Sequence, residues 1–102
     1  MANICENRLF LSTENKKNYK FLVGKIEKLF ECYNISEHEG DKSCEIDFES
    51  RWTFPDKIFQ ELTDEIGLDD SLYIRVLSYE FGCDYVGYNA YQNNEWIDKL
   101  NQ

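Results

Sequence analysis

Apolar and acidic residues alternate without interruption through residues 44–49. Because successive side chains of a β-strand point to opposite faces, this hexamer predicts a strand with one buried face and one charged face. Its apolar residues are Cys44, Ile46 and Phe48, and its acidic residues are Glu45, Asp47 and Glu49. The strand is expected to continue to about Trp52.

Two other segments carry apolar residues at the three- and four-residue spacing of an amphipathic helix. The first spans residues 15–33 and has lysines over much of its outer face. The second begins at Phe54 and Pro55, since proline is tolerated at the first helical position. It ends at Gly67, because glycine commonly follows the last turn of a helix.

The remaining pattern predicts strands separated by turns. Residues 34–43 resemble a connecting loop, residues 82–84 a turn, and residues 93–95 the end of the last strand before a short C-terminal segment. The three further strands are expected at residues 7–11, 72–79 and 85–92.

The element order β-α-β-α-β-β predicts an α+β fold in one domain spanning residues 1–102. Two helices would cover one face of a four-stranded, mostly antiparallel sheet in a two-layer sandwich. No element remains for the second face, so it would meet either solvent or a partner. That face is expected to display Arg8, Phe10, Glu45, Asp47, Glu49, Tyr73, Arg75 and Tyr79.

Three short segments give the chain a resemblance to a known family. They are NICENRL at residues 3–9, RWTFP at residues 51–55 and YEFGCDYVG at residues 79–87. With these segments the chain resembles the YubB-like family, small proteins of plasmids, phages and other mobile elements. The resemblance covers most of the chain and implies a ferredoxin-like domain of mobile-element origin. It implies no catalytic residues.

The charge is large and unevenly distributed. The chain has 20 acidic and 11 basic residues, a net charge of −9. Residues 37–70 alone hold twelve acidic and three basic residues, whereas residues 1–30 hold three acidic and six basic ones. Direct binding to nucleic acid or to an anionic membrane needs clustered Lys and Arg, so the acidic balance argues against both.

The sequence also favours a soluble, reduced, cytoplasmic protein. The four cysteines include no CxxC pair, and the N-terminus lacks a basic leader followed by an apolar run. No apolar run approaches the roughly 20 residues that a membrane helix needs. Buried, inert thiols are expected, because a nucleophilic cysteine requires a nearby base. The cysteines are Cys5, Cys32, Cys44 and Cys83.

Enzymatic chemistry has little support in the pattern. His38, with Glu37, Glu39 and Asp41, suggests an oxygen-rich metal site, but a solvated loop lacks the preorganisation of such a site. The acidic row of residues 45–49 could hold Mg²⁺ in a nuclease, yet the clustered basic residues needed to bind phosphates lie on the first helix, away from this face. We therefore expect no catalytic residues, no metal and no cofactor.

The acidic row is more simply explained as a contact surface for a basic host protein. The first hypothesis is a non-enzymatic interaction module of a phage or mobile element, inhibiting a nucleic-acid-targeting defence system in the manner of an anti-CRISPR protein. Alternate carboxylates on a strand lie roughly 6.7 Å apart, whereas duplex DNA presents a charge about every 1.7 Å. One row is too sparse to mimic DNA. Acids of the second helix and its end would have to extend it: Glu61, Asp64, Glu65, Asp69 and Asp70.

The aromatic residues of the same face favour a protein contact over RNA stacking, because Arg8 and Arg75 alone do not form the basic surround that RNA binding needs. Tyr and Arg are preferred anchors of protein interfaces, which makes Tyr73, Arg75 and Tyr79 candidates for partner binding. The second hypothesis is accordingly a self-associating structural module that dimerises through this face. The alternative that the acids only solubilise the protein also stays open.

Overall fold

The protein is described from a computed structural model, which describes residues 4–38, 42–80, 82 and 84–99. Within these residues the chain forms two helices and six strands in the order β-α-β-β-α-β-β-β. The elements are β1 (Ile4–Ser12), α1 (Lys16–Leu29), β2 (Glu31–His38), β3 (Ser43–Arg51), α2 (Asp56–Ile66), β4 (Tyr73–Glu80), β5 (Tyr85–Gln92) and β6 (Glu95–Asp98).

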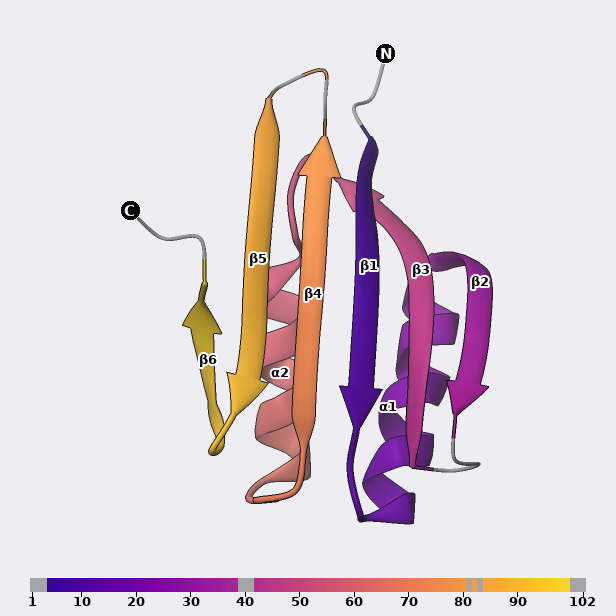
Figure 1. The fold of residues 1–102 in the computed structure, drawn as a ribbon, viewed down its shortest axis with the longest axis vertical. Helices are drawn as coiled ribbons and strands as arrows, with labels where there is room; N and C mark the ends of the chain where they lie inside the picture. The colour runs from indigo at the N-terminus through magenta and orange to yellow at the C-terminus, as the bar shows by residue number, and fades with distance from the viewer. Residues whose placement is uncertain (1–3, 39–41, 81, 83, 100–102) are drawn as a thin grey trace.

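The strands form one sheet in the order β2-β3-β1-β4-β5-β6, and every neighbouring pair is antiparallel. Figure 1 shows both helices behind this sheet, with α1 behind the β2, β3 and β1 side and α2 behind β4 and β5. We call the uncovered sheet face the open face. The predicted α+β architecture with helices on one face is confirmed, but the four-stranded ferredoxin-like sheet is wrong, because β2 and β6 extend it to six strands.

Strand β2 replaces the predicted end of the first helix and the loop after it. Helix α1 ends at Leu29, since Phe30 adopts an extended backbone with φ of −131° and ψ of 157°. The Phe30 ring packs on Phe48, with centroids 4.7 Å apart. This core contact outweighs the local helical spacing, as tertiary packing often does.

A β-bulge between Cys32 and Asn34 hides β2 from pattern analysis. Cys32 lies opposite Phe48 and Ile35 opposite Ile46, so Cys32 and Ile35 share the helix-covered face although they are three residues apart. The extra residue of a bulge breaks the two-residue alternation by which strands are identified.

Strand β6 pairs with β5 in a hairpin, where the sequence pattern predicted only a short C-terminal segment after the last strand. Asn93 and Asn94 connect β5 to β6 with φ values of 53° and 63°. Two consecutive positive φ angles are typical of a type I′ turn, which suits a tight hairpin and favours asparagine. Trp96 then pairs opposite Tyr91.

The core lies between the sheet and the two helices. Cys44, Ile46 and Phe48 are fully buried, which confirms the alternation predicted for residues 44–49. Neighbouring aromatic rings pack with centroids 4.7–6.0 Å apart. This aromatic cluster consists of Phe30, Phe48, Phe54, Phe59, Tyr91 and Trp96.

The start of α1 and the end of α2 agree with local sequence signals. The Asn15 side chain accepts a hydrogen bond from the backbone N–H of Asn18 and caps α1. Helix α2 ends before Gly67, whose φ of 82° suits glycine. Pro55 precedes the helix as its N-cap residue instead of occupying the first helical position.

Among the described residues, neither α1 nor α2 has the length and apolar character of a membrane-spanning helix.

Candidate protein-interaction face

The sheet register arranges side chains in rows across the open face. In one row Asp47 of β3 lies opposite Arg8 of β1, which lies opposite Leu77 of β4. In the next row Glu45 lies opposite Phe10, and Phe10 lies opposite Arg75. The register places all eight residues expected on this face there: Arg8, Phe10, Glu45, Asp47, Glu49, Tyr73, Arg75 and Tyr79.

A third row adds two carboxylates, Glu6 and Glu31, that were not among the predicted open-face residues. Glu49 of β3 lies opposite both Glu6 of β1 and Glu31 of β2. Glu31 was missed because residues 31–33 fit the helical spacing of α1. Glu6 could have been found, since it alternates with Arg8 at the start of β1.

One of these carboxylates has a partner within the chain. The Tyr33 hydroxyl donates a hydrogen bond to Glu6 Oε1. Burial raises the pKa of Tyr33, and the Glu6 carboxylate raises it further. Tyr33 is therefore neutral near pH 7 and serves as a hydrogen-bond donor to Glu6 in the row across strands that also holds Glu49 and Glu31.

Two aromatic rings contact the central arginine, Arg75. The Arg75 guanidinium lies 4.7 Å from the centroid of the Phe10 ring and 6.0 Å from that of Tyr73. Such cation–π contacts are worth about 0.5–1 kcal/mol at an exposed site. They hold the guanidinium beside the aromatic rings.

The carboxylates of the open face outnumber its arginines. Strands β1–β4 direct five carboxylates and three guanidinium groups to this face, a balance of −2 for these four strands. Within the part of the chain that the structure describes, no arginine forms an ion pair with a carboxylate within 4.0 Å. The ion pair on this face joins His38 Nε2 to Glu45 Oε2 at 3.4 Å, with both side chains exposed.

A shallow hollow of about 340 Å³ lies at the centre of the open face. Two arginines and two carboxylates line it, together with aromatic and aliphatic side chains. A mixed lining of this kind can receive either a basic or an acidic side chain of a partner. Its lining includes Arg8, Phe10, Glu45, Asp47, Arg75 and Leu77.

The other predicted acidic residues do not extend the open face. Asp64 and Glu65 are exposed on α2, which lies behind the sheet (Figure 1). Asp70 follows α2, and its Oδ1 accepts a hydrogen bond from Asn94 Nδ2 at 2.8 Å. The described acids of residues 37–70 are therefore divided between the two layers and the loops.

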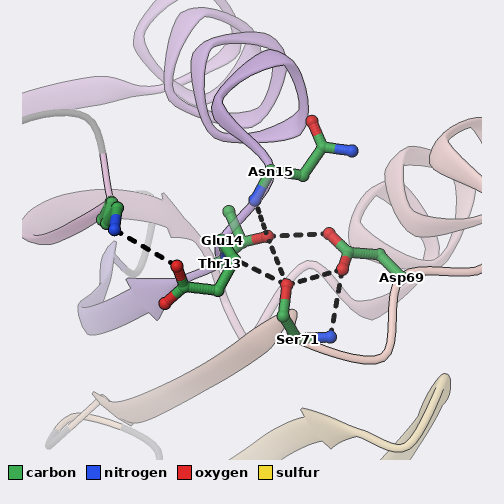
Figure 2. Close-up of polar contacts among 6 residues, drawn as sticks. Thr13, Glu14, Asn15, Asp69 and Ser71 are labelled. Atoms are coloured by element: carbon green, nitrogen blue, oxygen red, sulfur yellow. Dashed lines mark hydrogen bonds and ion pairs between the residues drawn. The ribbon is translucent and has the colours of Figure 1, made fainter.

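Asp69 connects the segment before α1 with the segment before β4, and Figure 2 shows its contacts with Thr13 and Ser71. Its Oδ2 accepts from Thr13 Oγ1 at 2.7 Å and from Asn18 Nδ2 at 2.9 Å. Its Oδ1 accepts from the Ser71 backbone N–H and hydroxyl, at 3.0 Å and 2.7 Å. Burial alone would raise the pKa of Asp69, but these hydrogen bonds outweigh it and lower the pKa. Asp69 thus has a structural role.

The thiols of the described cysteines are poorly suited to nucleophilic chemistry. Cys5 and Cys44 are fully buried and Cys32 is partly buried. Burial raises the pKa of all three thiols, which lowers the thiolate fraction at neutral pH. Cys83 lies outside the described residues.

The metal site considered at His38 cannot be assembled from the described residues. Glu37 lies opposite the buried Cys44 on the helix-covered face, whereas His38 lies opposite Ser43 on the open face. Glu39 and Asp41 lie outside the described residues. No group of three or more potential metal ligands occurs within residues 4–38, 42–80, 82 and 84–99.

No family model, curated protein or solved structure matches the chain. The resemblance to the YubB-like family therefore stays a prediction. The candidate site is supported by the sheet register and the side-chain contacts of the open face.

Proposed function

We propose that the protein is a non-enzymatic interaction module that binds a basic protein through its open face. The observation that supports this function is the set of five carboxylates on three adjacent strands, β2, β3 and β1. Both helices lie on the other side of the sheet (Figure 1), so this set is accessible. Complementary charge of this kind accelerates association and selects partners.

Proteins that bind nucleic acids are the class of partner that this face fits, because they carry clustered Lys and Arg. A nucleic-acid-binding effector of a host defence system is one such protein, and its inhibition by a phage or mobile-element protein is the corresponding role. The carboxylates lie about 6.7 Å apart along a strand and about 4.8 Å apart between strands. This spacing favours a contact with a basic patch over imitation of a duplex.

A charge-reversal experiment tests the proposal. The open-face variant carries Glu45→Lys, Asp47→Lys and Glu49→Lys. The matched control carries Glu61→Lys, Asp64→Lys and Glu65→Lys, which are exposed positions of α2. Each variant replaces three acidic residues by lysine, so the two variants have the same net charge. Affinity capture from host lysate with quantitative mass spectrometry should recover basic proteins with wild type and control, and lose them with the open-face variant.

Two results would contradict the proposal. One is equal loss of the basic proteins from both variants, which would show a dependence on net charge alone. The other is a captured protein that both variants retain, which would place its binding elsewhere. Thermal unfolding followed by circular dichroism verifies that both variants are folded.

A self-associating module remains the second candidate, because the same face also exposes apolar side chains. Leu77 and Val86 are 41% and 55% exposed, and both lie on the open face beside Tyr88 and Tyr79. Light scattering over a concentration series should reveal a dimer that Leu77→Glu disrupts. A monomer up to high micromolar concentration would count against self-association.

A further inference from the structure

Strand β2 forms one edge of the sheet and has an unpaired side. It pairs with β3 alone among the described elements. Seven of its eight residues are exposed, and the eighth is partly exposed. An edge strand presents backbone N–H and C=O groups to which another extended chain can pair. The opposite edge strand, β6, has only four residues and offers a shorter template.

Part of β2 is regular and weakly protected against pairing. Natural edge strands are often blocked by Pro, by charged side chains, Lys above all, or by a bulge. β2 contains neither Pro nor Lys, its bulge lies between Cys32 and Asn34, and its regular part carries one carboxylate, Glu37. From Asn34 to His38 the register with β3 is regular, so five residues remain as a template.

The side chains beside this template favour a basic segment on the open face. Asn34 and Ser36 of β2 are short and lie opposite Asp47 and Glu45 of β3. An added strand would lie about 4.8 Å from β2 and about twice that distance from β3. Flexible Lys and Arg side chains directed to the open face can extend across the short residues of β2 toward these carboxylates.

The helix-covered side of the same template presents one apolar residue, Ile35, and one carboxylate, Glu37. Ile35 lies on this side and is 38% exposed, so it offers an apolar contact to an added strand. Helix α1 lies behind this end of the sheet (Figure 1) and carries five lysines. These lysines disfavour further basic side chains on that side.

We propose that the β2 edge receives an extended segment of the partner as a seventh strand, with Lys or Arg alternating with apolar residues. This inference rests on the proposed function and specifies how the basic partner binds. A second copy of the chain fits the edge less well, because pairing of two β2 strands would bring together two acidic rows and two basic helices.

Synthetic peptides test the inference without changing the protein. The first peptide alternates Lys and Val over about ten residues, enough to span the template. Two further peptides carry N-methyl groups on either all lysines or all valines, and a fourth has the same composition in a non-alternating order. An added strand uses the N–H groups of alternate residues, so only one N-methylated peptide should lose affinity.

Isothermal titration calorimetry should show binding of the alternating peptide and of one N-methylated peptide. The other N-methylated peptide and the non-alternating peptide should bind about tenfold or more weakly, because each lacks backbone pairing or correct side-chain placement. Hydrogen exchange should slow at β2 amides when the alternating peptide binds.

Equal binding of all four peptides would overturn strand addition and leave a purely electrostatic contact, consistent with the proposed function. Absence of binding by every peptide would also overturn strand addition. The capture experiment with the open-face variant and its α2 control decides the proposed function separately. Concentration-dependent dimerisation with protection of β2 amides would assign the edge to a second copy and overturn the inference.

Discussion

At the residue scale, Asp69 shows why an acidic residue cannot be assigned to a binding surface from sequence alone. Its two carboxylate oxygens accept four hydrogen bonds from the Thr13, Asn18 and Ser71 side chains and the Ser71 backbone. These contacts join the start of α1 to the start of β4. A charge run in the sequence contains no sign that one member is used internally.

Asp69→Asn should lower the free energy of unfolding by about 1–3 kcal/mol at pH 7, because it replaces an ionised acceptor of several hydrogen bonds. The pKa of Asp69 is lower in the folded state than in the unfolded chain, where it is about 3.9. The stabilisation that ionised Asp69 gives is therefore fully present above the unfolded-state pKa and is lost as pH falls through the folded-state pKa. Urea unfolding from pH 7 to pH 3 should show the difference between variant and wild type shrinking below about pH 4. A constant difference would contradict this role.

At the same scale, Glu49 lies between two other carboxylates, Glu6 and Glu31, on neighbouring strands. Like charges directly opposite in a sheet are destabilising. Glu49→Gln should therefore raise the free energy of unfolding by about 0.2–1 kcal/mol in low salt, and less in high salt. Exposed Glu61→Gln on α2 is the control. A destabilised Glu49→Gln variant would show that the row is not under repulsion.

At the element scale, the strands at the two edges account for the difference between the predicted and observed folds. The alternation of residues 44–49 and the apolar spacing of α2 were sufficient to predict these two elements, because one face of each packs on the core. β2 was not predictable in this way, because its bulge removes the alternation and Phe30 fits the helical spacing of α1. The β5–β6 hairpin did carry a local signal, the two consecutive asparagines.

The residues of the open face could also be predicted from the alternation of side chains, because alternation determines which residues point away from the helices. The assembly of Glu6 and Glu31 beside Glu49 depended on the order of strands in the sheet, which no local pattern contains. The separation of Asp64 and Glu65 from the open face likewise depends on which side of the sheet α2 covers.

The turn between β5 and β6 gives a prediction at the element scale. Asn94 has a φ of 63°, and its side chain contacts Asp69 and Asp70. Asn94→Gly loses only the side-chain hydrogen bonds, whereas Asn94→Ala also forces alanine into the left-handed region. Denaturant unfolding should show Asn94→Ala less stable than Asn94→Gly by about 1 kcal/mol. Equal stability of the two variants would contradict the importance of the turn conformation.

At the scale of the whole molecule, charge is segregated among three surfaces. α1 carries five lysines and one glutamate, whereas α2 carries four acidic residues and one lysine. The open face holds a separate acidic set beside aromatic rings and arginines. The net charge of −9 therefore does not identify the binding surface, and only a comparison between surfaces can do so.

The most direct test is the salt dependence of affinity for the captured basic protein, measured by calorimetry with wild type, the open-face variant and the α2 variant. Wild type and the α2 variant should bind with similar affinity and weaken in parallel as salt increases. The open-face variant should bind about tenfold or more weakly, with a smaller dependence on salt. Equal weakening of the two variants would contradict binding through the open face.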